Sequence, residues 1–184
     1  MRKVLFPLLA LLAAPMVGCT TNSPNSPGER VAMQDEAKAA IERIQAQDPG
    51  VRDLLNRAYA YVIFPDVGEA SLGVGGAHGR GYAYQNGQLV GTVTITEGSV
   101  GLQAGGATYS ELLVFQSDAP FNRLRNNVFA FGADATATIV KSGAAAQTQF
   151  NNGVQAYVMP KGGFEAGIAV KGQKFHFNPV DQNQ

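Results

Sequence analysis

The fold of this chain is decided by Gly68-Glu69-Ala70-Ser71-Leu72-Gly73-Val74-Gly75-Gly76-Ala77-His78-Gly79-Arg80-Gly81, which a second glycine-rich run follows at residues 98–107. Between the two runs, Asn86-Gly87 is typical of a two-residue hairpin turn, because both turn positions need a positive φ. In residues 90–96, threonine alternates with apolar residues, which predicts a strand with one polar and one apolar face. Glycine inside strands marks a bend or a close backbone approach. The stretch therefore predicts a strongly curved antiparallel sheet or a small barrel.

Two helices are predicted before this sheet. A capping box at residues 26–29 opens the first helix, and Asp48-Pro49 opens the second. Apolar residues recur at helical spacing along both: Met33, Ala37, Ile41 and Ile44 in the first, and Val51, Leu54, Leu55 and Ala58 in the second. The polar faces mix acids with bases, and the apolar faces lack Phe and Trp. We therefore expect the helices to cover the sheet. The alternative is that they insert into a membrane as amphipathic helices.

The remaining elements are predicted from alternation and turn residues. A strand over residues 59–64 is expected to end at Pro65, and a helix over residues 118–127 is expected to turn Phe121, Leu124 and Val128 inward. Further strands are predicted at residues 111–115, 129–140, 154–159, 164–170 and 173–177. The expected fold class is α+β, with N-terminal helices packed on a curved, Gly-rich antiparallel β-sheet or small barrel. We expect one domain over residues 29–184.

The first residues have the pattern of a signal peptide. A basic start at residues 1–3 precedes an apolar segment at residues 4–14 that is too short to span a bilayer comfortably. Gly18 then precedes Cys19, the only cysteine, in an arrangement that resembles a bacterial lipobox. The resemblance implies cleavage before Cys19. It also implies a diacylglycerol group attached to the Cys19 sulfur as a thioether, and a fatty acid such as palmitate on the amino group of Cys19. The alternative is an ordinary secretory peptide that is cut near Ala14.

The anchor has consequences for location. Several acyl chains would attach the protein stably to a membrane. By resemblance to sorted lipoproteins, Thr20 in place of an aspartate favours the outer membrane, with the domain facing the periplasm. Residues 1–18 are then the lipoprotein signal peptide, and residues 19–28 are a polar, flexible tether.

Composition and motifs exclude several classes of function. Without Arg2 and Lys3, the 14 basic residues fall to 12 against 14 acidic ones, a net charge of −2, so we expect no nucleic-acid partner. One cysteine and two distant histidines offer no metal-ligand spacing, and we expect no cofactor. His78 is expected at an exposed turn and His176 at an outward strand position. Residues 73–79 lack both the dinucleotide and the P-loop fingerprints, and no nucleophile motif is present, so we expect no enzyme.

The order of several motifs resembles a known family. These motifs are Phe64-Pro65, Gly73-Val74-Gly75-Gly76, Gly79-Arg80-Gly81, Gly101-Leu102-Gln103-Ala104-Gly105-Gly106 and Gly162-Gly163-Phe164-Glu165-Ala166-Gly167-Ile168. Over roughly residues 32–177 they resemble the SYLF domain, a lipid-binding family that includes the yeast actin-binding Ysc proteins. The resemblance implies lipid binding. The lipid-binding and actin-binding residues of the family do not map onto this chain, so none is carried over.

Five basic residues, most of them at predicted turns, are candidates for contact with lipid headgroups: Arg80, Lys141, Lys161, Lys171 and Lys174. Cations at loop tips can bind phosphate at an anionic surface. The alternative is that each is an ordinary solubilising residue. Antiparallel order would place Lys161 and Lys171 at opposite ends of the predicted meander.

Together these patterns predict a lipid-anchored bacterial envelope protein with a SYLF-like domain and a non-enzymatic role. The domain would bind lipid, with anionic headgroups as one candidate, or another envelope component. One alternative is a structural or scaffold lipoprotein that recruits protein partners. The other is an envelope hydrolase or transferase, which would need a deep pocket that holds a histidine with a carboxylate and a serine.

Overall fold

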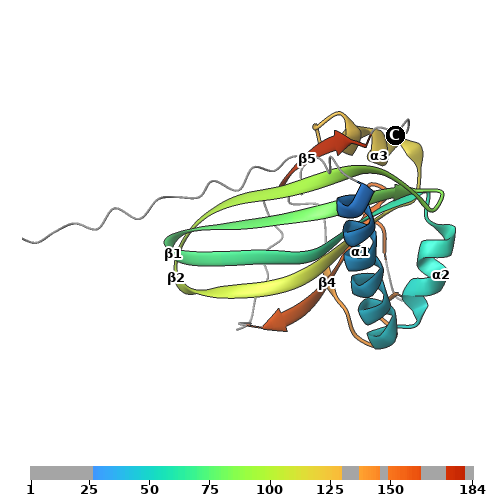
Figure 1. Ribbon diagram of the computed structural model, residues 1–184. Coiled ribbons are helices and arrows are strands. Elements are labelled where there is room, and N and C mark those ends of the chain that lie inside the picture. Colours follow the sequence, from blue (N-terminus) through green and yellow to red (C-terminus); the bar gives the residue numbers. More distant parts are fainter. Residues whose placement is uncertain (1–26, 130–136, 146–148, 163–172, 181–184) are drawn as a thin grey trace, which may run out of the picture.

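The computed structural model describes residues 27–129, 137–145, 149–162 and 173–180 of the chain (Figure 1). Two helices, α1 (Pro27–Gln47) and α2 (Gly50–Arg57), precede two long strands, β1 (Ala60–Gln85) and β2 (Gln88–Phe115). The later elements are α3 (Asp118–Arg125), β3 (Ala137–Ile139), β4 (Val154–Gly162) and β5 (Lys174–Pro179). None of these described helices is long and apolar enough to cross a membrane.

The strands β1 and β2 form one long antiparallel hairpin, which Figure 1 shows curving along its length. Its turn is at Asn86 and Gly87, with φ of 52° and 77°, which confirms the predicted turn. The curvature brings the two halves of β1 together. A Cβ atom added at Gly81 would lie 2.5 Å from the ring of Phe64, so the absence of a side chain permits this approach.

The described strands form an open sheet in the order β1-β2-β4-β3, and β5 also pairs with β2. Because β2 is long, it pairs with β5 along residues 91–96 and with β4 along residues 108–115. The pairs are antiparallel except for β3 with β4, which run parallel. The α+β class and the curved sheet are confirmed. The predicted antiparallel order holds for every described strand pair except β3 with β4.

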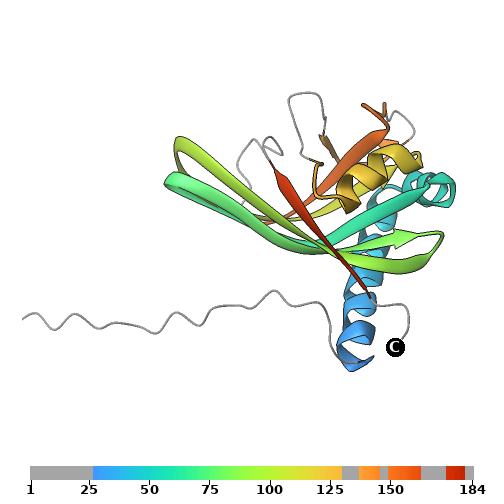
Figure 2. The same ribbon diagram turned by 90° about the horizontal axis from the view of Figure 1, so that it is seen from above.

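The sheet is covered on both faces, and Figure 2 shows α1 and α3 on opposite sides of it. On the α1 side, the buried residues of α1 and α2 pack against strand residues such as Ile63, Leu112 and Tyr157. On the α3 side, the core is rich in phenylalanine: Phe64, Phe115, Phe121, Phe129, Phe175 and Phe177. Burial on both sides explains why residues 60–64 and 111–115 are almost continuously apolar.

The predicted helices are largely confirmed. The buried stripe of α1 consists of Met33, Ala37, Ala40 and Ile44, whereas the predicted Ile41 is half-buried. This stripe packs on the sheet, in agreement with the covering role that we expect for α1. The inward orientation predicted for Val128 is wrong, because its exposed fraction is 70%. The helix α3 ends at Arg125, and Asn127 turns the chain with a left-handed φ of 58°.

The strand predicted at residues 164–170, the turn with Lys171 and most of the strand predicted at residues 129–140 lie outside the described residues. The same is true of the predicted signal peptide, Cys19 and residues 20–26.

We predict that Gly91→Ala destabilises the protein. The added methyl group would overlap the ring of Phe177 and lie 2.8 Å from the carbonyl oxygen of Asn178. Overpacking of this kind costs about 1–3 kcal/mol of unfolding free energy, which chemical denaturation can measure. Gly68→Ala is the matched control, because a Cβ at Gly68 meets no atom within 4 Å. Phe177→Leu should recover part of the loss in the double variant, and strictly additive losses would contradict the steric account.

Candidate functional site

A cleft of about 560 Å³ lies between α1, both halves of β1 and the end of β4. We call it the basic cleft. It is lined by Glu36, Ala39, Arg43, Pro65, Asp66, Arg80, Tyr82 and Lys161. Three of these side chains are cationic and two are anionic, so the lining carries a formal charge of +1 although the whole chain is neutral.

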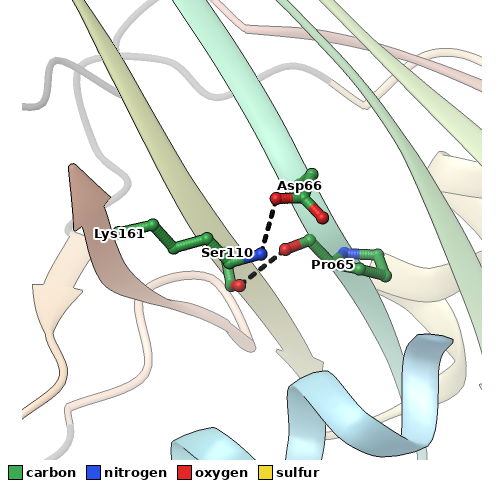
Figure 3. A network of polar contacts seen from close by, with 4 residues as sticks. All are labelled: Pro65, Asp66, Ser110 and Lys161. Carbon is green, nitrogen blue, oxygen red and sulfur yellow. Dashed lines mark hydrogen bonds and ion pairs between the residues drawn. The ribbon is translucent and has the colours of Figure 1, made fainter. Parts of the chain in front are cut away.

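The floor of the basic cleft is an irregularity in β1. The register of β1 against β2 shifts between Phe64 and Val67, so Pro65 and Asp66 form a bulge. Proline lacks an amide hydrogen, and bulges are among the few positions where a sheet accepts it. The buried Ser110 hydroxyl donates to the Pro65 carbonyl oxygen at 2.6 Å (Figure 3). The prediction that a strand ends at Pro65 is therefore wrong, because the bulge lets β1 continue to Gln85.

Two polar contacts hold the walls of the basic cleft. The Lys161 Nζ atom lies 2.5 Å from Asp66 Oδ1 and so joins β4 to β1 (Figure 3). The Tyr82 hydroxyl donates to Glu36 Oε2 at 3.1 Å and joins β1 to α1. Burial, and then the charge of Glu36, raise the pKa of the Tyr82 phenol above its usual range, so the phenol keeps the proton that it donates.

The basic cleft is also lined by two guanidinium groups, those of Arg43 and Arg80, which take no part in these two contacts. Within the described part of the chain, neither Arg43 nor Arg80 forms an ion pair. Arg43 is exposed on α1, and Arg80 is half-exposed on β1. A guanidinium group presents several N–H donors in a plane that matches the oxygens of a phosphate or carboxylate. The basic cleft can therefore bind an anionic oxygen group.

The structure separates the five predicted basic residues. It brings Arg80 and Lys161 together at the basic cleft. Lys141 lies in the turn after β3, and Lys174 begins β5, so neither lines the cleft. Lys171 lies outside the described residues, and its separation from Lys161 stays a prediction.

Sequence reasoning missed the contribution of α1 to this site. Glu36 and Arg43 lie on the helix surface beside the buried stripe, and they line the cleft together with Ala39. Their spacing of three and four residues places them on one side of a helix, which is a detectable signal. Only the packing of α1 on β1 shows which strand residues they face.

The two histidines lie on different strands, His78 on β1 and His176 on β5. His78 is exposed, as expected, but it lies within β1 and not at a turn, because the glycine-rich stretch continues the strand. His176 is exposed on β5, as predicted. His78 also lines a hollow of about 540 Å³ with Glu69 and Glu97, and among the side chains that the structure describes no serine lines it. No three His, Cys, Asp or Glu side chains of the described residues are placed to hold a metal ion.

A buried polar network lies on the other face of the sheet. Glu111 of β2 is fully buried, and its Oε2 atom accepts from Gln173 Nε2 at 3.2 Å. Gln173 Nε2 also donates to the Tyr109 hydroxyl oxygen at 3.2 Å. Burial raises the pKa of Glu111 to about 8, and burial together with Glu69 raises that of Glu97 to about 7. A carboxyl group in an otherwise apolar strand, residues 111–115, is the sequence signal for this burial.

Comparison with known proteins bears on the second half of the chain. None of the curated proteins matches this chain. Residues 96–183 match the family described as "Ysc84: Las17-binding protein actin regulator". The resemblance that the motifs indicate is thereby confirmed from residue 96 onward, and between residues 32 and 95 it stays a prediction. The matched residues run from within β2 through β5, so the similarity to the Ysc84 (SYLF) family is shown for this part of the chain.

Proposed function

We propose that this chain is a lipid-anchored protein of the bacterial envelope whose domain binds anionic phospholipid headgroups at the basic cleft, without catalysis. The observation that carries the proposal is the meeting of Arg43, Arg80 and Lys161 at one cleft. Acyl chains on Cys19 would hold the protein at the outer membrane, with the domain facing the periplasm.

The dimensions and charge of the basic cleft suit a headgroup. Small-molecule sites usually have volumes of about 300–1,000 Å³, and this cleft lies within that range. Each cation near an anionic surface contributes roughly 1 kcal/mol to binding. Asp66 already neutralises Lys161, so Arg43 and Arg80 would supply most of the attraction for phosphate.

The second candidate is recruitment of a protein partner, which the description of the matched family as Las17-binding favours. A separate groove of about 750 Å³ between α1 and the β1–β2 turn could accept a peptide segment. Its lining includes Ile41 and the stacked rings of Tyr61 and Tyr84, whose centroids are 5.1 Å apart.

Co-sedimentation with vesicles tests the first candidate. The chain from Thr20 onward contains every element that the structure describes and lacks the anchor, which would otherwise bind any bilayer. It should sediment with vesicles of phosphatidylglycerol and phosphatidylcholine in equal parts, less so at higher salt, and not with phosphatidylcholine alone. Absence of binding to both kinds of vesicle would contradict headgroup binding and favour a protein partner.

We predict that Arg43→Gln combined with Arg80→Gln weakens binding to anionic vesicles about thirtyfold, because two cations of roughly 1 kcal/mol each are lost. Arg52→Gln combined with Arg125→Gln changes the net charge equally. Both control residues are exposed and neither lines the basic cleft. An equal loss of binding in both double variants would show that total charge, and not the cleft, drives association.

A separate measurement tests the lipid anchor at Cys19. Intact mass of the protein extracted from membranes should equal that of the chain from Cys19 onward plus a diacylglycerol group and one amide-linked acyl chain. An unmodified chain that begins elsewhere would contradict the anchor and leave the binding experiment unaffected.

A further inference from the structure

Three neighbouring strands present six polar side chains on one face of the sheet. The register of β1, β2 and β5 places them in two rows, because residues directly opposite each other and residues two apart along a strand share a face. We call these six residues the basic face. The rows are His78–Thr96–Lys174 and Arg80–Thr94–His176.

The basic face points away from the core. The residues that alternate with it are buried, with exposed fractions of 5% for Ala77, 0% for Ile95 and 4% for Phe175. Lys174 and His176, in contrast, are exposed. The basic face therefore lies on the side of the sheet that α1 occupies, since the next row begins with Tyr82, which contacts Glu36 of α1.

The chemistry of the basic face suits a layer of phosphate groups. Adjacent strands are about 4.8 Å apart and alternate residues are about 6.8 Å apart, so the four basic residues occupy the corners of a rectangle of about 10 by 7 Å. Threonine hydroxyls lie between them and can donate to phosphate oxygens. None of the six side chains is acidic. Because Arg80 also lines the basic cleft, the basic face and the basic cleft are continuous.

The position of the start of α1 limits how far this part of the domain could lie from a membrane that holds Cys19. Arg30 and Gln34, near the start of α1, line a groove together with Gly87 and Gln88 of the β1–β2 turn. The start of α1 therefore lies beside the turn of the hairpin whose strands carry the basic face. Residues 19–26 are eight residues, which can span at most about 28 Å. An anchor at Cys19 would therefore keep the start of α1, and the β1–β2 turn beside it, within about 28 Å of the bilayer.

We propose that the basic face is the surface on which the domain lies against an anionic bilayer, with the basic cleft at its edge holding one headgroup. This inference rests on the proposed function and adds the docking orientation, together with roles for Lys174, His176 and His78.

A fluorescent label tests the orientation directly. The chain from Thr20 onward contains no cysteine, so Thr96→Cys provides a single attachment site at the centre of a row. An environment-sensitive dye there should shift its emission to shorter wavelength when vesicles of phosphatidylglycerol and phosphatidylcholine in equal parts are added. The same dye at Val128→Cys, an exposed position after α3 on the opposite side, should not shift. A shift at Val128→Cys alone would overturn the proposed orientation.

Charge variants supply the second readout. Lys174→Gln should weaken binding to these vesicles about fivefold, whereas Arg125→Gln on α3 should change it less than twofold. Lys174 does not line the basic cleft, so this variant separates the two surfaces. Thermal unfolding would verify that both variants are folded.

The outcomes distinguish the two proposals. If the unsubstituted domain binds neither kind of vesicle, the proposed function fails and the basic face fails with it. If the domain binds and the Arg43 and Arg80 variant is weakened, but Lys174→Gln binds normally and the dye at Thr96→Cys does not shift, headgroup binding stands and the basic face is not the docking surface.

Discussion

Asp48→Ala is expected to lower the unfolding free energy by about 3 kcal/mol, because three partly buried amides would lose their acceptor. The Asp48 carboxylate lies between α1 and α2 with an exposed fraction of 1%. Its Oδ1 atom accepts from the amides of Gly50 at 3.1 Å and Gly143 at 3.3 Å, and its Oδ2 atom accepts from Ala145 at 2.6 Å. The residue thus opens α2 and also holds the turn after β3 against the helices.

Chemical denaturation of Asp48→Ala, Asp48→Asn and a control would check this result. Asp48→Asn keeps one carbonyl acceptor and should lie between the alanine variant and the unsubstituted protein. Asp53→Asn is the matched control, because Asp53 is exposed on α2, and a change of at most about 0.5 kcal/mol is expected. Equal stability of Asp48→Ala and the control would contradict a role for these hydrogen bonds.

Glu111→Gln is expected to stabilise the protein, and more strongly at high pH than at low pH. Burial raises the pKa of Glu111 to about 8 in the folded protein, whereas an exposed glutamate has a pKa of about 4.3. Between these values, the folded state retains a proton that the unfolded state has released. The unsubstituted protein therefore loses stability as the pH rises from about 4.5 to about 8, and the loss is complete above that range.

Glutamine removes this dependence because it cannot ionise. Its amide group can also donate to Gln173 Oε1, a buried atom that has no partner among the described residues. Glu97, with a pKa raised to about 7, remains in the variant and acts in the same direction at lower pH. The variant should therefore keep a slope below about pH 7 and lose it between about pH 7 and 8.

Thermal unfolding at about pH 5 and about pH 8.5 would measure the effect. The gain in Tm of Glu111→Gln should be several degrees larger at the higher pH, since 1 kcal/mol corresponds to about 2–4 °C for a domain of this size. Glu42→Gln on the exposed side of α1 is the control, and it should change Tm equally at both pH values. The same gain for Glu111→Gln at both pH values would show that this carboxyl group is not held neutral.

Local patterns in the sequence determined the elements of this fold. Asn86 and Gly87 specify their turn through positive φ values, and the alternation in residues 90–96 separates a buried from an outward face. The spacing of the α1 stripe likewise identifies the covered side of the helix. These features depend on residues within a few positions of one another, so they can be predicted without knowledge of the rest of the chain.

The tertiary structure alone decided which of these elements meet. Arg43, Arg80 and Lys161 share a cleft because α1 packs beside the bulge at Pro65 and β4 pairs with β2 at its level. Asp48 binds the amide of Gly143, 95 positions away. Glu111 accepts a hydrogen bond from Gln173, 62 positions away. Such contacts follow from strand register and from packing on both faces of the sheet, which no short stretch of sequence specifies.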